Sequence, residues 1–192
     1  MTQMIDRAET IRNGVDTATM FATLDAIKAQ PEIATFRFRA HNQWIGGAHN
    51  RSTIHDFYAA CAEDTSRQSA FALDAGEPAI LLGTDTGPNP AEYLLHALAA
   101  CVTTSLVYVA AARRVKLAAV SSELEGEMDV RGALGISDDY RNGFTKITIK
   151  VTLSGDASPE KLREIVERGC RRSAVFDMVS NGVPVDVDVV TP

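Results

Sequence analysis

One apolar segment dominates the pattern of hydrophobic and polar positions along the chain, and it runs from Tyr93 to Ala112. His96 is its one strongly polar side chain. A helix that is apolar on all sides is a buried helix, so the pattern predicts a core helix over residues 90–113. Cys101 is therefore expected in or beside the core, where most cysteines are inert.

The residues before this segment carry the signals of a helix start. Asn89 can cap the helix, Pro90 suits its first position, and Glu92 stands where the acid of a capping box reaches back. The glycine- and proline-rich residues 83–90 predict a loop that leads into the helix.

Strands are predicted where apolar and polar residues alternate, because successive side chains of a strand point to opposite faces. The clearest alternation covers residues 144–153. Shorter or weaker patterns predict strands at 33–40, 53–57, 68–73, 79–82, 115–130 and 183–190, a turn at 44–47 and a loop at 132–142.

Helical spacing and end signals predict three further helices. They are 1–30, which stops at Pro31, then 159–171 with Ser158 as its cap, and 173–180, which ends at Asn181-Gly182. Strands and helices are grouped along the chain rather than alternating, and this order predicts an α+β fold.

The composition is that of an ordinary globular protein with one domain or two small ones. The chain has 192 residues, of which 45% are hydrophobic and 23% charged, and its net charge is −6. An acidic chain without a basic run is not expected to bind nucleic acid or an anionic membrane surface.

The apolar segment is long enough to span a membrane, but its composition favours a buried helix. His96, the hydroxyl residues at 103–105, the many alanines and the polar capping motif all weigh against a span. The chain starts without a charged-then-apolar signal pattern, and its three cysteines are an odd number without close spacing. We therefore expect a reducing, cytoplasmic setting.

The segment Gly87-Pro88-Asn89-Pro90-Ala91-Glu92-Tyr93-Leu94-Leu95-His96-Ala97-Leu98-Ala99-Ala100-Cys101 resembles a specific family motif. Together with Glu77-Pro78, Gly126 and Ser173-Ala174-Val175, it makes the chain similar to the OsmC/Ohr proteins, the osmotically inducible protein C and organic hydroperoxide resistance family. The resemblance covers about residues 36–190. We therefore predict a helical extension over 1–31 and an OsmC-like domain over 32–192.

The resemblance implies an intertwined α+β homodimer, with antiparallel sheets around a long buried central helix and active sites at the dimer interface. It implies reduction of organic hydroperoxides without a bound cofactor, with Cys101 as the peroxidatic cysteine and a thiol reductant such as a dithiol or a lipoyl protein. That role requires a thiolate whose pKa is lowered by its surroundings.

The second cysteine of the mechanism is where the chain departs from the family pattern. The resolving cysteine opens a Cys-Pro-Val tripeptide in competent relatives, and Ser173 stands in its place here. Cys170 lies about one helical turn earlier and could replace it if that turn points towards Cys101. A structural role for Cys170 is the alternative, and an external thiol would then complete the cycle.

The resemblance also implies an arginine near the thiol and an acid that positions it. Arg51 and Arg39 are the candidates for the arginine, with Arg37 on the same strand face as Arg39. Glu92 is the candidate acid, but on an ideal helix it lies opposite Cys101. Glu92 therefore acts either as a capping-box residue or across the subunit interface.

The remaining histidines and the third cysteine carry weaker signals. His41, His49 and His55 lack the spacing and the further ligands of a metal site, so no metal is expected. His96 is expected as a hydrogen-bonded core histidine, and Cys61 as a structural or surface thiol.

Two functions from different classes follow. The first is a thiol-dependent peroxidase that reduces organic hydroperoxides through Cys101. The alternative is a non-catalytic dimer of the same fold that binds a small lipophilic ligand in its interface cleft, and the missing Cys-Pro-Val cysteine motivates it.

Overall fold

A computed structural model describes residues 10–191, and within it the chain forms two compact units. One unit combines residues 10–15 with 95–191, and the other covers 16–94. The fold is α+β with antiparallel sheets and a long helix, as the sequence predicted. The predicted division into an extension over 1–31 and a domain over 32–192 stays a prediction.

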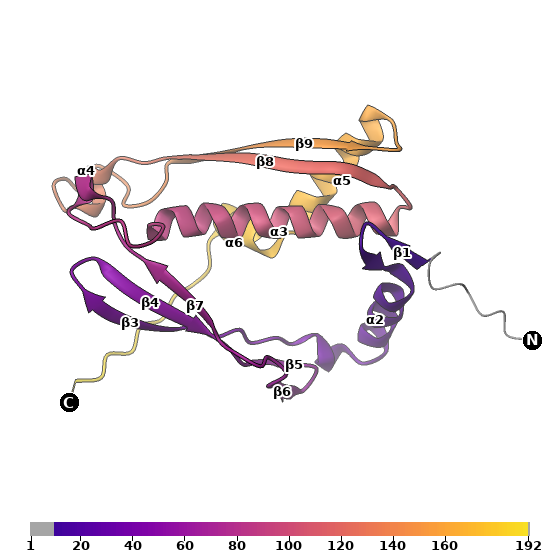
Figure 1. Ribbon diagram of the computed structural model, residues 1–192, viewed down its shortest axis with the longest axis horizontal. Coiled ribbons are helices and arrows are strands. Elements are labelled where there is room, and N and C mark those ends of the chain that lie inside the picture. The colour runs from indigo at the N-terminus through magenta and orange to yellow at the C-terminus, as the bar shows by residue number, and fades with distance from the viewer. Residues whose placement is uncertain (1–9, 192) are drawn as a thin grey trace, which may run out of the picture. The chain divides into compact units, whose positions relative to one another are not determined.

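Helix α3 spans Pro90–Ala112, and its part from Leu95 onwards forms the centre of the first unit. Figure 1 shows the long hairpin of β8 (Leu117–Glu127) and β9 (Lys146–Gly155) running along this helix. The two strands pair antiparallel, with Ser122 opposite Val151. The unit is completed by α4 (Val130–Ala133), α5 (Pro159–Arg172) and α6 (Ala174–Asn181).

The core of this unit lies between α3, the inner face of the β8–β9 sheet and α5. Leu98, Val102, Leu106 and Val109 follow the spacing of one helix face, and all are buried. Ile165 of α5 is fully buried against them. The inward-facing residues of both strands pack against the same cluster: Val120, Leu124, Ile147, Ile149, Val151 and Leu153.

A glycine allows α5 to approach α3 closely. A Cβ atom at Gly169 would lie 2.6 Å from Leu106 Cβ and 2.8 Å from its Cα. Because real Cβ atoms do not come this close to a backbone, only glycine fits at this crossing. The crossing brings the C-terminal end of α5, and the start of α6 after it, alongside α3.

The 16–94 unit is built around a three-stranded antiparallel sheet. Its order is β3 (His41–Gly46), β4 (His49–Ile54) and β7 (Phe71–Ala75), as Figure 1 shows. A small hairpin pairs β5 (Phe57–Ala59) with β6 (Ala62–Asp64). The helices of this unit are α2 (Thr17–Ala29), the short 3-10 helices η1 (Pro31–Ala34) and η2 (Ala79–Leu81), and the first turn of α3.

Helix α3 was predicted almost residue by residue. Among the described residues it is the one helix long and apolar enough to cross a membrane by length and composition. Core helices of globular proteins share that property, and six residues of α3 are buried within the protein. His96 is a correction to the prediction, because its side chain is exposed and not part of the core.

The predicted helix over 1–30 is only partly right. Residues 1–9 lie outside the described part, and Thr17–Ala29 is helical. Between them, β1 (Ile11–Arg12) and β2 (Val15–Asp16) form a hairpin. Asn13 and Gly14 both have positive φ, 53° and 78°, which is the signature of the tight hairpin turn that an Asn-Gly pair favours. The Asn13-Gly14 turn therefore determined the structure at this point, and the helical spacing of the apolar residues did not.

Two of the longer predicted strands are absent from the described residues. Residues 33–40 contain the end of η1 and then an extended segment with a single bridge between Arg37 and Tyr58. Residues 183–190 are extended without a partner strand, and their valines are 58–91% exposed. An alternating segment forms a strand only where a neighbouring strand and an apolar surface are available for pairing and packing. Within residues 10–191, the segment 183–190 has neither.

Three smaller differences concern one short predicted strand and two element boundaries. Residues 79–82 form a 3-10 helix and not a strand, since Leu82 takes a left-handed conformation that a strand excludes. The predicted loop at 132–142 begins with the end of α4, which Asp129 caps. The turn at 44–47 is shifted, because Trp44 and Ile45 still belong to β3.

Candidate functional site

Cys101 lies about three turns into α3, on the part of the helix that belongs to the core unit. Its side chain is half-buried, and its neighbours Leu98 and Val102 are buried in the core. The prediction that Cys101 lies in or beside the core is therefore confirmed.

A buried serine, Ser173, lies at the start of α6. Helix α5 ends at Arg172, and the Ser173 N–H donates to the Cys170 carbonyl at 3.1 Å. Ser173 then caps α6, since its Oγ accepts a hydrogen bond from the Phe176 N–H at 3.2 Å. Ser173 is only 1% exposed and is the most buried polar residue described. Serine at the N-cap is the expected residue type, because its oxygen satisfies an otherwise unpaired helical N–H.

The Cys101 thiol lies beside this helix start. Its sulfur interacts with the Ser173 hydroxyl, the backbone N–H groups of Val175 and Ala174, and the Ser105 hydroxyl one turn further along α3. Burial alone would raise the pKa of this thiol, and the hydrogen bonds outweigh it, so the pKa of Cys101 falls below its ordinary value. The site thus favours a thiolate, the reactive form of cysteine.

Cys170 has the opposite surroundings. It lies on the last turn of α5 and packs against the apolar core cluster. Burial raises the pKa of the Cys170 thiol, opposed weakly by a backbone hydrogen bond and by the charge of Arg171. In residues 10–191 all three cysteines are free thiols, and Cys170 is not one of the groups that hydrogen-bond to Cys101.

Cys61 is a surface thiol, in keeping with the sequence reasoning. It is exposed at the tip of the β5–β6 hairpin, where Ala59 pairs with Ala62. Ala60 and Cys61 form the turn and both have positive φ, 49° and 64°.

Glu92 takes the capping-box role that the sequence offered as one of its two interpretations. The Asn89 N–H donates to Glu92 Oε2 at 2.9 Å, and the Glu92 N–H donates to Asn89 Oδ1 at 2.8 Å. This reciprocal pair satisfies two backbone N–H groups at the start of α3. The second interpretation, a role across a subunit interface, stays a prediction.

Arg51 is held by a carboxylate of the neighbouring strand. Its Nε and Nη2 donate to Asp74 Oδ1 and Oδ2 at 2.9 and 3.0 Å, and His49 Nε2 lies 2.7 Å from the same carboxylate. Both partners hold the pKa of Asp74 below its usual value. A cavity of about 340 Å³ is lined by His41, Asn42, Gln43, Arg51 and Thr53.

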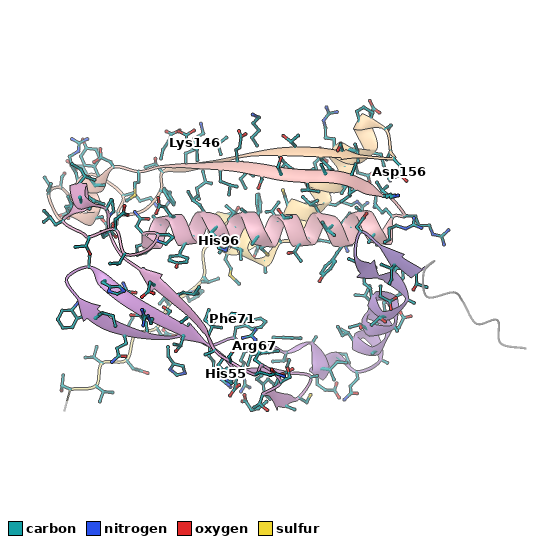
Figure 2. All side chains as sticks on the ribbon, viewed as in Figure 1. His55, Arg67, Phe71, His96, Lys146 and Asp156 are labelled. Carbon is teal, nitrogen blue, oxygen red and sulfur yellow. The ribbon has the colours of Figure 1, made fainter. Side chains whose placement is uncertain are left out.

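The other candidate arginines also have partners within the 16–94 unit. Arg39 forms a two-pronged ion pair with Glu63, with both N–O distances at 2.7 Å. Arg37 stacks over the Tyr58 ring, with its guanidinium carbon 4.8 Å from the ring centre. Figure 2 labels Arg67 and Phe71 in the same unit, where Arg67 lies 5.4 Å from the Phe71 ring centre. The role of Arg51 or Arg39 beside the thiol stays a prediction.

His49 and His55 each contact one carboxylate. His49 contacts Asp74, and His55 Nδ1 lies 2.5 Å from Asp56 Oδ1. Within residues 10–191, no group of three or more His, Cys, Asp or Glu side chains could hold a metal ion.

Sequence reasoning missed the residues that surround the thiol. Ser173 was singled out only as the residue that replaces a cysteine, and Ser105 only as one polar residue of an apolar segment. The signal for Ser173 was present, because a serine between two helical stretches is a candidate N-cap. The signal for Ser105 was its spacing of one helical turn from Cys101.

Comparisons with known proteins agree with this architecture. The model of a family described as OsmC-like protein matches residues 83–188. An OsmC-like protein from Mycoplasma pneumoniae has 13% sequence identity and a TM-score of 0.58, with 76% of this chain and 88% of that chain covered. An organic hydroperoxide resistance protein OsmC from Legionella pneumophila has 16% identity and a TM-score of 0.55, covering 78% of this chain and 93% of its own.

A third solved structure adds a relative without an assigned activity. An OsmC-like protein of unknown function from Vibrio cholerae has 12% identity and a TM-score of 0.55, with 73% of this chain and 92% of that chain covered. At these identities the likeness concerns the fold. A comparison with the curated proteins found no match.

Proposed function

The chain belongs to the OsmC-like protein family, and we propose that it reduces organic hydroperoxides with the thiol of Cys101. One observation carries the proposal: the Ser173 hydroxyl and the first N–H groups of α6 lie beside the Cys101 sulfur and lower the pKa of its thiol. Such donors favour the thiolate, which is the nucleophile that peroxide reduction requires. The fold shared with a solved organic hydroperoxide resistance protein supports the same substrate class.

The reaction balances on the thiol and the peroxide alone. The Cys101 thiolate attacks the terminal oxygen of the hydroperoxide, a sulfur–oxygen bond forms and the oxygen–oxygen bond breaks. Sulfur loses an electron pair and becomes a sulfenic acid, while the peroxide is reduced. The alkoxide that leaves takes a proton from water and departs as an alcohol.

We include a homodimer in the proposal. The apolar valines of the C-terminal segment, 58–91% exposed, support it, because isolated chains rarely leave such a run uncovered. Light scattering on the purified protein would give the mass of a dimer, and the mass of a single chain at micromolar concentration would contradict this part of the proposal.

The test of the function is consumption of cumene hydroperoxide in the presence of dithiothreitol. The wild-type chain and Cys61→Ser should consume the peroxide at the same rate, since Cys61 is an exposed hairpin residue. Cys101→Ser should consume none above the rate of dithiothreitol alone. Wild-type activity in Cys101→Ser would contradict the proposal, and a Cys101 that stays reduced in the wild type would favour the lipophilic-ligand alternative.

A further inference from the structure

We propose that the chain works with a single catalytic thiol: Ser173 holds the Cys101 thiolate, and an external thiol, not Cys170, reduces the oxidised sulfur. This inference rests on the proposed function and adds the way in which the cycle closes. Ser173 is a positioning residue in this scheme, because it acts through the sulfur of Cys101.

The direction of the Ser173 hydroxyl is fixed by its second role. A hydroxyl has one proton to donate and lone pairs that accept. The Phe176 N–H already donates to Ser173 Oγ, and with 1% exposure the group has no access to bulk water. The Cys101 sulfur lies beside this hydroxyl, so the proton can point to it.

The first turn of α6 adds donors that have no partner within the helix. The first N–H groups of a helix lack an intrahelical acceptor, and they form the positive end of the helix dipole. Here the N–H groups of Ala174 and Val175 lie beside the Cys101 sulfur and lower the pKa of its thiol. Ser173 starts the helix that supplies them, so one residue both donates to the thiolate and places two further donors around it.

Cys170 lacks the properties of a resolving thiol. Its side chain packs into the apolar cluster, where burial disfavours the thiolate that would attack the oxidised sulfur.

An external thiol closes the cycle in two balanced steps. The thiolate of a small thiol or a protein dithiol attacks the sulfenic sulfur of Cys101, a sulfur–sulfur bond forms and the sulfur–oxygen bond breaks. The hydroxide that leaves takes up the proton that the external thiol released and departs as water. A second thiol attacks the mixed disulfide, releases the Cys101 thiolate and leaves with the first as an oxidised disulfide. The external thiol supplies the electrons that the peroxide has taken up.

The first experiment follows the fate of Cys101 without a reductant. The full chain receives one equivalent of cumene hydroperoxide, and intact and peptide masses are recorded with and without dimedone. We expect a gain of one oxygen atom, trapped by dimedone at Cys101, to the same extent in the wild type and in Cys170→Ser. A loss of two hydrogens with a Cys101–Cys170 disulfide would overturn this inference alone. An unchanged mass would overturn the proposed function, and this inference with it.

The second experiment tests Ser173. Loss of a hydrogen bond to a charged group should slow the oxidation of Cys101 by about tenfold at neutral pH in Ser173→Ala. The pH at which the rate is half-maximal should also move upwards. Ser158→Ala is the matched control, because Ser158 caps α5 in the same way through the Lys161 N–H and does not touch Cys101. A Ser173→Ala variant with the wild-type rate and pH profile would overturn the role of Ser173.

A substitution in the other direction tests whether Ser173 occupies the resolving position. Ser173→Cys places a thiol where the hydroxyl now contacts Cys101. After peroxide treatment this variant should lose two hydrogens and form a disulfide between Cys101 and the introduced thiol, in place of the gained oxygen. A persistent sulfenic acid at Cys101 in a folded Ser173→Cys variant would contradict the placement.

Discussion

Cys101 and Cys170 lie on adjacent helices of the same unit, and both are half-buried, but their surroundings are opposite. Cys101 of α3 meets hydroxyls and helix N–H groups, and the pKa of its thiol is lowered against the effect of burial. Cys170 of α5 meets apolar side chains, and burial raises the pKa of its thiol. Burial alone therefore does not decide which thiol is reactive, whereas hydrogen-bond donors at the sulfur do.

The contact between α5 and α3 should matter most to this contrast, because it positions both thiols. Gly169→Ala would push a Cβ atom into the backbone of Leu106, so we expect a loss of about 1–3 kcal/mol in the free energy of unfolding. Separation of the helices should also weaken the hydrogen bonds at Cys101 and slow its alkylation. Urea unfolding and alkylation kinetics measure the two effects.

Gly46→Ala is the matched control for this substitution. A Cβ atom at Gly46 meets nothing within 4 Å, so stability and thiol reactivity should stay unchanged. If Gly169→Ala is as stable as Gly46→Ala, the close approach of the two helices is not required.

Cys170→Ser should separate packing from chemistry. A hydroxyl placed among apolar neighbours without a partner costs about 1 kcal/mol or more, so the unfolding midpoint should fall. The rate of Cys101 oxidation should not change. A loss of oxidation in a folded Cys170→Ser variant would show that Cys170 takes part in the chemistry.

Ser105→Ala should affect the thiol less than Ser173→Ala does. Ser105 contributes the weakest of the hydrogen-bonding effects on the Cys101 thiol, and it caps no helix. We expect a decrease in the oxidation rate of a few-fold, with unchanged thermal stability. An effect larger than that of Ser173→Ala would reverse the order of the two hydroxyls.

The smallest expected effect concerns the stability of the protein at acid pH and the ion pairs of Glu164 on α5. Lys161 and Arg113 lower the pKa of Glu164 to about 2. Because the folded pKa is depressed, the stabilisation is present above the ordinary value of 4.5 and is lost as the pH falls towards 2. Glu164→Gln should be slightly less stable than the wild type at neutral pH, and its stability should fall less as the pH is lowered. Thermal unfolding across an acid pH series would detect both effects. If the stability of the variant falls with pH as that of the wild type does, the ion pairs of Glu164 do not contribute to acid stability.

Local signals predicted the core unit well. The capping residues Asn89 and Glu92 and the apolar run behind them defined α3, while Ser158 and the Asn181-Gly182 pair marked the start of α5 and the end of α6. The alternation over 144–153 defined β9. These features are local or periodic, so they can be interpreted without knowledge of the neighbours.

The features that the sequence did not predict depend on residues that are distant along the chain. The alternation of residues 183–190 predicted a strand, but a strand needs a neighbour, and in the described residues this segment has none. The surroundings of Cys101 arise from Ser173 and the start of α6, which reach the thiol only because Gly169 lets α5 approach α3. The motif around Cys101 pointed to the residue, whereas its hydrogen bonds followed from the tertiary fold.

The contrast between the two thiols is tested most directly by their alkylation as a function of pH in one protein. Cys61→Ser, which removes the exposed third thiol, is treated with iodoacetamide across a pH series, and the modification of each remaining cysteine is measured by peptide mass spectrometry. We predict that Cys101 is alkylated at a lower pH than Cys170 and that this difference shrinks in Ser173→Ala. Equal midpoints, or a lower midpoint for Cys170, would contradict the assignment of Cys101 as the reactive thiol.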